Sequence, residues 1–150
     1  MSAAGLVLVC AIELLGRSQE VLPPIVILDT APAGASPHAA GFVRRGEHVI
    51  YLIASSPVFQ SALEARSERG QCRGLDSLRL LASIIVHEEW HLNHDSTEEG
   101  AYYAQLTMLQ QLGAGPGRWP YESVRQALIS VRAREAKRME IAHGQIAASR

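Results

Sequence analysis

The segment His87-Glu88-Glu89-Trp90-His91 constrains this chain more than its other features do. Residues four apart lie on one face of an α-helix, so both imidazoles can reach the same ion if the segment is helical. Apolar residues at helical spacing precede the segment and share the face of the histidines; they are Leu80, Leu81, Ile84 and Ile85. The sequence therefore predicts a half-buried helix that carries His87 and His91 at its end.

Two histidines and a glutamate in this arrangement are typical of a zinc site. A catalytic zinc takes three protein ligands and a water molecule, and imidazole nitrogen is one of its preferred ligands. Glu88 lies beside the first ligand and can act as general base, taking a proton from water that the metal has made more acidic. We expect His87 and His91 to bind Zn2+ and Glu88 to be catalytic. The alternative is that both histidines are hydrogen-bonded core residues.

A third ligand must come from nearby, and four side chains that follow the motif are suitable: His94, Asp95, Glu98 and Glu99. His94 and Asp95 follow the motif so closely that we expect them at the helix end, pointing off its axis. The two glutamates fall at the start of a further helix, predicted from about Thr97 to Leu112.

Helix phase separates the two glutamates. Glu98 shares a core-facing stripe with Tyr102 and Gln105, whereas Glu99 lies on the neighbouring face. Glu99 also fits a capping box with Ser96 at the cap. We therefore favour Glu98 as the third metal ligand, and the other candidates stay open.

The order of these motifs resembles that of the gluzincin metallopeptidases. In this pattern HExxH, here beginning at His87, is followed by a glutamate on the next helix, here Glu98 in an ExxA step. The step is similar to that of M48-like and ImmA/IrrE-like peptidases. The match covers under a quarter of the chain. It departs in the short link between His91 and Glu98, and in Tyr102, where those families carry Asp or Asn.

The resemblance implies zinc-dependent hydrolysis of an extended peptide or protein substrate. In such enzymes an edge strand above the cleft pairs with the substrate, and the segment from Val49 to Ala54 is the candidate here. A rival reading is a regulatory or interaction domain that binds zinc without turnover. Another is a structural helical domain that binds no metal.

Other side chains near the motif each have two possible roles. Tyr102 or Tyr103 could donate a hydrogen bond to the oxyanion of the reaction, but we favour ordinary packing, with the hydroxyl bonded to solvent or backbone. Gln105 could orient a zinc ligand or be an ordinary surface residue. Trp90 is expected to pack away from the metal. We expect His38 and His48, which lie in or beside a long loop, to be exposed.

The predicted architecture is α+β, a zincin-like minimal domain with a small two- or three-stranded sheet against four or five helices. Strands are expected within Val21 to Leu28 and at Val49 to Ala54, separated by a long loop from Asp29 to Glu47. An apolar helix covers about Ala3 to Leu15. The last helix, from about Tyr121 to His143, should have a solvated second half.

Composition fits one soluble globular domain over residues 1–150, with 47% hydrophobic and 19% charged residues. A net charge of -1 gives no excess of positive charge that would indicate binding to nucleic acid or to an anionic membrane. The first helix is too short to span a bilayer, although it could bury against a second copy in a homodimer. Cys10 and Cys72 fit reduced thiols in a cytoplasmic protein, with one long-range disulfide as the alternative.

Overall fold

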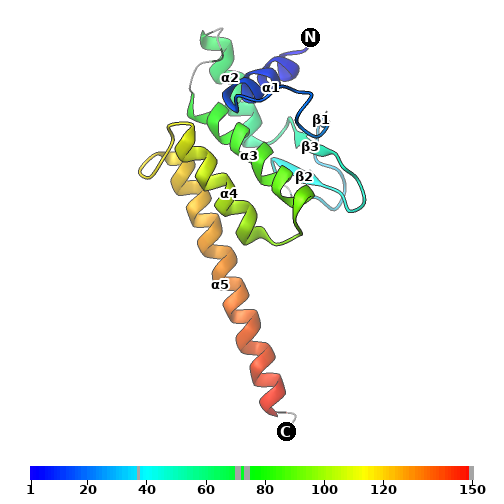
Figure 1. Cartoon of the computed structure of the whole chain (residues 1–150), viewed down its shortest axis with the longest axis vertical. Helices are drawn as coiled ribbons and strands as arrows, with labels where there is room; N and C mark the ends of the chain where they lie inside the picture. The colour runs from blue at the N-terminus through cyan, green and yellow to red at the C-terminus, as the bar shows by residue number, and fades with distance from the viewer. Residues whose placement is uncertain (37, 70–71, 73–74, 149–150) are drawn as a thin grey trace.

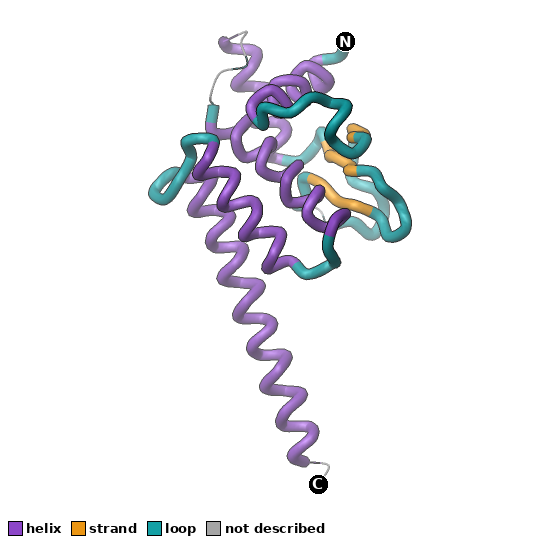
Figure 2. The backbone as a smooth tube through the Cα atoms, in the orientation of Figure 1, coloured by secondary structure: helices purple, strands orange, loops and turns teal. Residues whose placement is uncertain are grey.

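Helices occupy most of the chain, and a small sheet lies at one side of them (Figures 1 and 2). The computed structural model describes residues 1–36, 38–69, 72 and 75–148. The elements in these residues are α1 (Ala3–Leu14), β1 (Ile25–Leu28), β2 (Gly41–Val43), β3 (Ile50–Ile53), α2 (Pro57–Arg69), α3 (Asp76–Asn93), α4 (Glu98–Gln111) and α5 (Trp119–Ala148). The predicted α+β class is confirmed.

The three strands form a mixed sheet in the order β1-β3-β2. β3 runs parallel to β1 and antiparallel to β2, and it is therefore the central strand. The prediction that the segment from Val49 to Ala54 is an edge strand is wrong. The edge strands are β1 and β2. β2 lies inside the segment predicted as a loop, because three residues are too few to show the alternation of a strand.

The central helix α3 forms the core together with α1 and the sheet. Val7 and Ala11 of α1 are buried in one hydrophobic cluster with Leu81 and Ile85 of α3 and Leu52 of β3. The first helix therefore packs on the core of its own chain, and a homodimer stays a prediction. Among the described residues, no helix has both the length and the apolar character needed to cross a bilayer.

A disulfide joins Cys10 of α1 to Cys72, which lies between α2 and α3. The prediction of two reduced thiols is wrong, and the alternative of one long-range disulfide is correct. The spacing of the two cysteines carries no signal for this pairing, because the packing of α1 beside the start of α3 brings them together. Disulfides are rare in the cytosol, and the cytoplasmic location stays a prediction.

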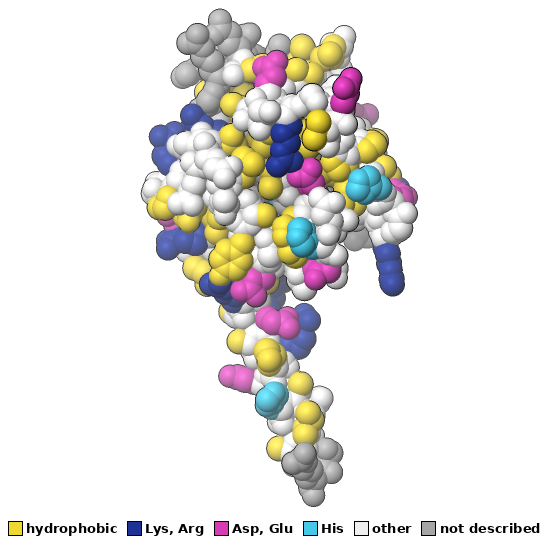
Figure 3. Space-filling model, in the orientation of Figure 1, with side chains coloured by type: hydrophobic (Ala, Val, Ile, Leu, Met, Phe, Trp, Pro, Cys, Tyr) yellow, Lys and Arg dark blue, Asp and Glu magenta, His cyan; other side chains and the backbone are white. Residues whose placement is uncertain are grey.

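The long helix α5 has two unlike halves. In the first half, Val124 and Leu128 are buried against Leu106 and Leu109 of α4. From Arg132 onward the described side chains are exposed, and the helix projects from the body of the molecule (Figures 1 and 3). The predicted solvated second half is confirmed, so the packed part of α5 is the part that borders α4.

The disulfide should stabilise the fold measurably. Replacing both cysteines with alanine (Cys10→Ala with Cys72→Ala) should lower the free energy of unfolding by about 2–4 kcal/mol, because the unfolded chain loses a long-range constraint. Urea denaturation followed by circular dichroism measures this. Mass spectrometry of the alkylated, unreduced wild-type protein should find neither cysteine modified; two modified cysteines in the folded protein would contradict the bond.

Candidate metal centre

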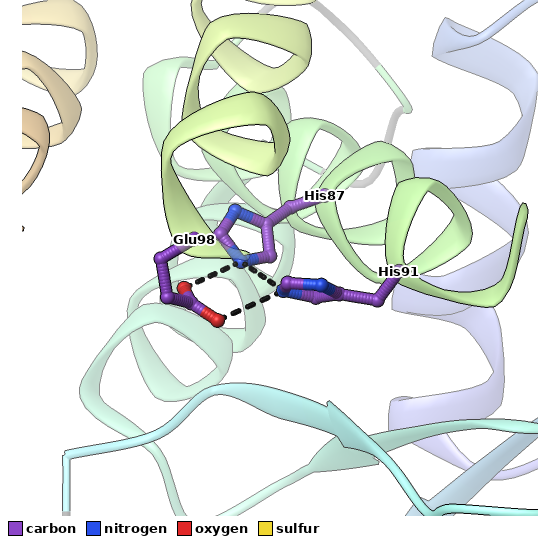
Figure 4. A group of neighbouring side chains, drawn as sticks. All are labelled: His87, His91 and Glu98. Carbon is purple, nitrogen blue, oxygen red and sulfur yellow. Dashed lines mark hydrogen bonds and ion pairs between the residues drawn. The ribbon is translucent and has the colours of Figure 1, made fainter. Parts of the chain in front are cut away.

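Three side chains from two helices converge at the end of α3 (Figure 4). His87 and His91 lie one turn apart on α3, and Glu98 is the first residue of α4. The two Nε2 atoms are 3.2 Å apart. Glu98 Oε2 lies 3.2 Å from Nε2 of His87, and Oε1 lies 2.9 Å from Nε2 of His91. The structure thus brings together the three residues that the sequence predicts as metal ligands.

The spacing of these atoms fits a small metal ion. Ligand atoms at zinc-binding distances in a tetrahedral shell are about 3.3 Å apart, which is close to the separations in this cluster. Nδ1 of His91 donates a hydrogen bond to the backbone carbonyl oxygen of Asp95 at 2.8 Å. In the neutral ring Nε2 of His91 therefore carries a lone pair. The cluster presents electron-pair donors to a cation at the separations that a small metal ion requires, and these separations do not fix which metal it is.

The electrostatics of the cluster favour positive charge. The hydrogen bond to Glu98 raises the pKa of His91 to about 9, against the opposing effect of burial. Hydrogen bonds from His87 and His91 lower the pKa of Glu98 to about 2. A proton and a metal ion would compete for the same nitrogen and oxygen atoms, because each supplies the charge that the carboxylate attracts.

Glu88 is buried beside the cluster and faces the same cleft. Burial raises the pKa of its carboxyl group, while the nearby His87 and His91 lower it. The cleft has a volume of about 1420 Å³, and α3, α4, α5 and β2 all contribute to its walls. A carboxyl group in this position can exchange a proton with a molecule bound in the cleft.

Tyr102 and Gln105 of α4 both contact His87. The Tyr102 ring meets the His87 ring edge-on, with centroids 4.7 Å apart. Burial, together with the negative charge of Glu98, raises the pKa of the Tyr102 hydroxyl, which keeps it protonated. Gln105 is buried, and its Oε1 lies 3.0 Å from Nδ1 of His87. The interpretation of Gln105 as a surface residue is wrong, and its contact with a predicted ligand is confirmed.

One residue of this cluster was not found from the sequence. Ser83 is fully buried, and its Oγ accepts a hydrogen bond from Nε2 of Gln105 at 3.1 Å. It lies one helical turn before His87, and that spacing places a hydroxyl on the motif face. A polar residue at this position in an otherwise apolar stripe is the signal that could have identified it.

The other ligand candidates, His94, Asp95 and Glu99, have different partners. Glu99 forms an ion pair with Arg132 of α5 at 3.0 Å. The capping box predicted for Glu99 is not formed, because the N-cap residue of α4 is Thr97 and not Ser96. The Thr97 side chain makes no capping bond to the helix; its hydroxyl and its backbone nitrogen both donate to Asp95 Oδ1. Nδ1 of His94 bonds to a backbone carbonyl oxygen at the end of α3. Each of these residues is exposed.

The two loop histidines are exposed, as predicted. His38 lies at the wall of the cleft, whereas His48 does not contribute to it. Neither belongs to the cluster of potential metal ligands, in which the described residues are His87, His91 and Glu98.

The short connection between α3 and α4 depends on a close contact between Trp90 and Gly100. The indole ring of Trp90 stacks on His94, with centroids 4.4 Å apart, and fills the space where a side chain of residue 100 would lie. Because glycine leaves this space free, α4 can approach the end of α3 closely enough for Glu98 to reach both histidines. The Trp90 ring also meets the His91 ring edge-on, with centroids 5.7 Å apart, so it lies beside a predicted ligand and does not pack away from it.

Comparisons of this chain with protein-family models, with curated proteins and with solved structures give no match. The resemblance to gluzincins therefore depends on the sequence motif alone, and the geometry shows a cluster that could bind a metal.

The contact at Gly100 gives a test of how the site is assembled. In Gly100→Ala the new methyl group would overlap the Trp90 ring, so α4 or the indole must shift. We expect unfolding free energy to fall by about 1–3 kcal/mol and zinc affinity to fall with it. Gly144→Ala is the control, since a methyl group there meets nothing within 4 Å and should stabilise the helix by up to about 1 kcal/mol. Unchanged zinc affinity in Gly100→Ala would contradict this account.

Proposed function

We propose that this chain is a zinc-dependent peptidase. His87, His91 and Glu98 would hold the ion, Glu88 would act as general base, and a peptide or protein would be the substrate. The observation that supports this most directly is the convergence of three ligand atoms within 4.8 Å, next to a buried glutamate and on the wall of an open cleft.

The open side of the cluster supports catalysis over a purely structural role for the metal. Structural zinc sites are closed by four protein ligands, whereas catalytic sites keep one position free. The described residues supply three ligands, and the Glu98 side chain is 45% exposed. A zinc ion bound here would supply Lewis acidity, which makes water more acidic and polarises a peptide carbonyl group.

Glu88 and Tyr102 have complementary parts in the proposed reaction. Glu88 takes one proton from the attacking water and returns it to the leaving amine, so that each cleaved peptide bond consumes one water molecule. Tyr102 donates a hydrogen bond to the carbonyl oxygen as negative charge develops on it. Both residues line the cleft, and Tyr102 contacts His87 there.

The substrate would bind along β2 and not along the segment from Val49 to Ala54. β3 is paired on both sides, whereas β2 is an edge strand whose residues line the cleft with the histidines. An extended peptide can add to such an edge through backbone hydrogen bonds, which gives affinity without a particular side-chain sequence. Figure 1 shows β2 beside the C-terminal half of α3.

Zinc content of neighbouring variants tests the ligand set. The wild-type protein, purified without a histidine tag, should contain one equivalent of zinc. In Glu98→Ala the affinity for zinc should fall by more than ~10–100-fold, which is the loss typical of removing a residue that only hydrogen-bonds to a metal ligand. Glu99→Ala is the matched control and should keep the metal, because Glu99 pairs with Arg132. Less than a tenth of an equivalent in the wild-type protein, or metal loss in Glu99→Ala alone, would overturn the assignment.

Glu88→Gln separates a peptidase from a zinc-binding domain without turnover. The variant keeps the shape of the side chain but cannot take up a proton, so hydrolysis should fall by about 10²–10⁴-fold while zinc stays bound. Cleavage of a mixture of quenched fluorescent peptides, followed with zinc, with chelator and with zinc restored, measures this. Equal cleavage by both proteins, or none by zinc-loaded wild-type protein, would favour the binding domain.

A further inference from the structure

We propose that Gln105 and Ser83 are positioning residues that hold the His87 ring in the one neutral tautomer able to bind a metal through Nε2. The inference rests on the proposed metal site, and it assigns the control of that site to a chain of buried hydrogen bonds. The chain runs from a backbone carbonyl group through Ser83 and Gln105 to the ring.

Ser83 sets the donor-to-acceptor direction of this series of hydrogen bonds. Oγ of Ser83 lies 2.7 Å from the backbone carbonyl oxygen of Leu80. A carbonyl oxygen has no proton to donate, so the hydroxyl hydrogen of Ser83 must point to it. The remaining capacity of Ser83 Oγ is that of an acceptor.

The serine in turn fixes the orientation of the Gln105 amide. Nε2 of Gln105 lies 3.1 Å from Ser83 Oγ and donates to it. The opposite orientation would place the amide oxygen against an oxygen whose only proton is already used. The amide oxygen of Gln105 must therefore face His87.

The amide in turn fixes the proton on His87. Oε1 of Gln105 lies 3.0 Å from Nδ1 of His87 and can only accept, so Nδ1 carries the hydrogen. In the neutral ring Nε2 then holds the lone pair. Nε2 faces His91 and lies 3.2 Å from Glu98 Oε2, a carboxylate oxygen that favours a proton on Nε2, so the Gln105 amide acts against this carboxylate in setting the tautomer. Without the chain, the two tautomers of His87 would compete, and one of them would present a proton to the metal.

Burial makes the chain selective. Gln105 is 4% exposed and Ser83 is fully buried, so bulk water does not reach these polar atoms readily to replace a lost partner. A buried amide without hydrogen-bond partners costs free energy. Reversing the Gln105 amide would leave its buried polar atoms without suitable partners. His91 needs no such device, because a backbone carbonyl oxygen already determines which of its nitrogens is protonated.

Zinc affinity of four variants tests the proposal, measured by competition with a chromophoric chelator. Gln105→Leu should weaken binding by about 10–100-fold, whereas Gln105→Glu keeps an acceptor and should restore most of it. Ser83→Ala releases the amide, and equal population of its two orientations would weaken binding by about twofold. Ser77→Ala is the control, since this serine is buried at the other end of α3 and should leave affinity unchanged.

The ring tautomer is a second readout that simple packing would not change. Two-bond proton–nitrogen NMR spectra of the metal-free protein, at a pH where the ring is neutral, should show His87 protonated on Nδ1 in the wild type. A mixture of tautomers should appear in Ser83→Ala and Gln105→Leu. Circular dichroism reports whether each variant is folded, and the wild-type spectrum tests the proposal if a variant does not fold.

The outcomes separate this inference from the proposed function. A wild-type His87 protonated on Nε2, or Gln105→Leu with wild-type affinity and tautomer, would overturn the role of the Ser83–Gln105 hydrogen bonds, while the metal site would stand. A wild-type protein that binds no zinc would overturn the proposed function, and the His87 tautomer would still report whether these hydrogen bonds form.

Discussion

The structure depends on a concentration of electron-pair donors at the end of α3. Two imidazole nitrogens and two carboxylate oxygens meet at separations near 3 Å. Their mutual repulsion is relieved only by a positive charge between them, whether from a proton or a metal ion. Binding of such a charge and closure of the α3–α4 pair are therefore coupled, because Glu98 can approach the histidines only when α4 is docked.

α3 is held near both of its ends by different means. Before its first residue, Cys72 is bonded to Cys10 of α1, and at its last turn the histidines face Glu98. Between these points the helix is buried, with Leu81 and Ile85 in the core. The covalent and hydrophobic parts do not require a metal, so they can keep the histidine pair on a formed helix when the site is empty.

The parts of the site governed by helical periodicity could be predicted from the sequence. His87 and His91 follow from spacing alone, and phase distinguishes Glu98 from Glu99. Features that depend on packing between distant segments could not be predicted: the pairing of Cys10 with Cys72, the strand β2, and the place of β3 at the centre of the sheet. Their physical cause is tertiary contact, which leaves no periodic trace in a segment of three or four residues.

The two sides of the cluster are held unequally, and this difference bears on function. On the α3 side, the histidine side chains are at most 9% exposed, and buried or backbone acceptors orient them. On the α4 side, Glu98 is half exposed, and its position depends on the short hairpin and on the contact of Trp90 with Gly100. A metal held here would have two firm ligands and one adjustable carboxylate beside the cleft. Such an asymmetric site is better suited to exchanging molecules at an open coordination position than to stabilising a fold.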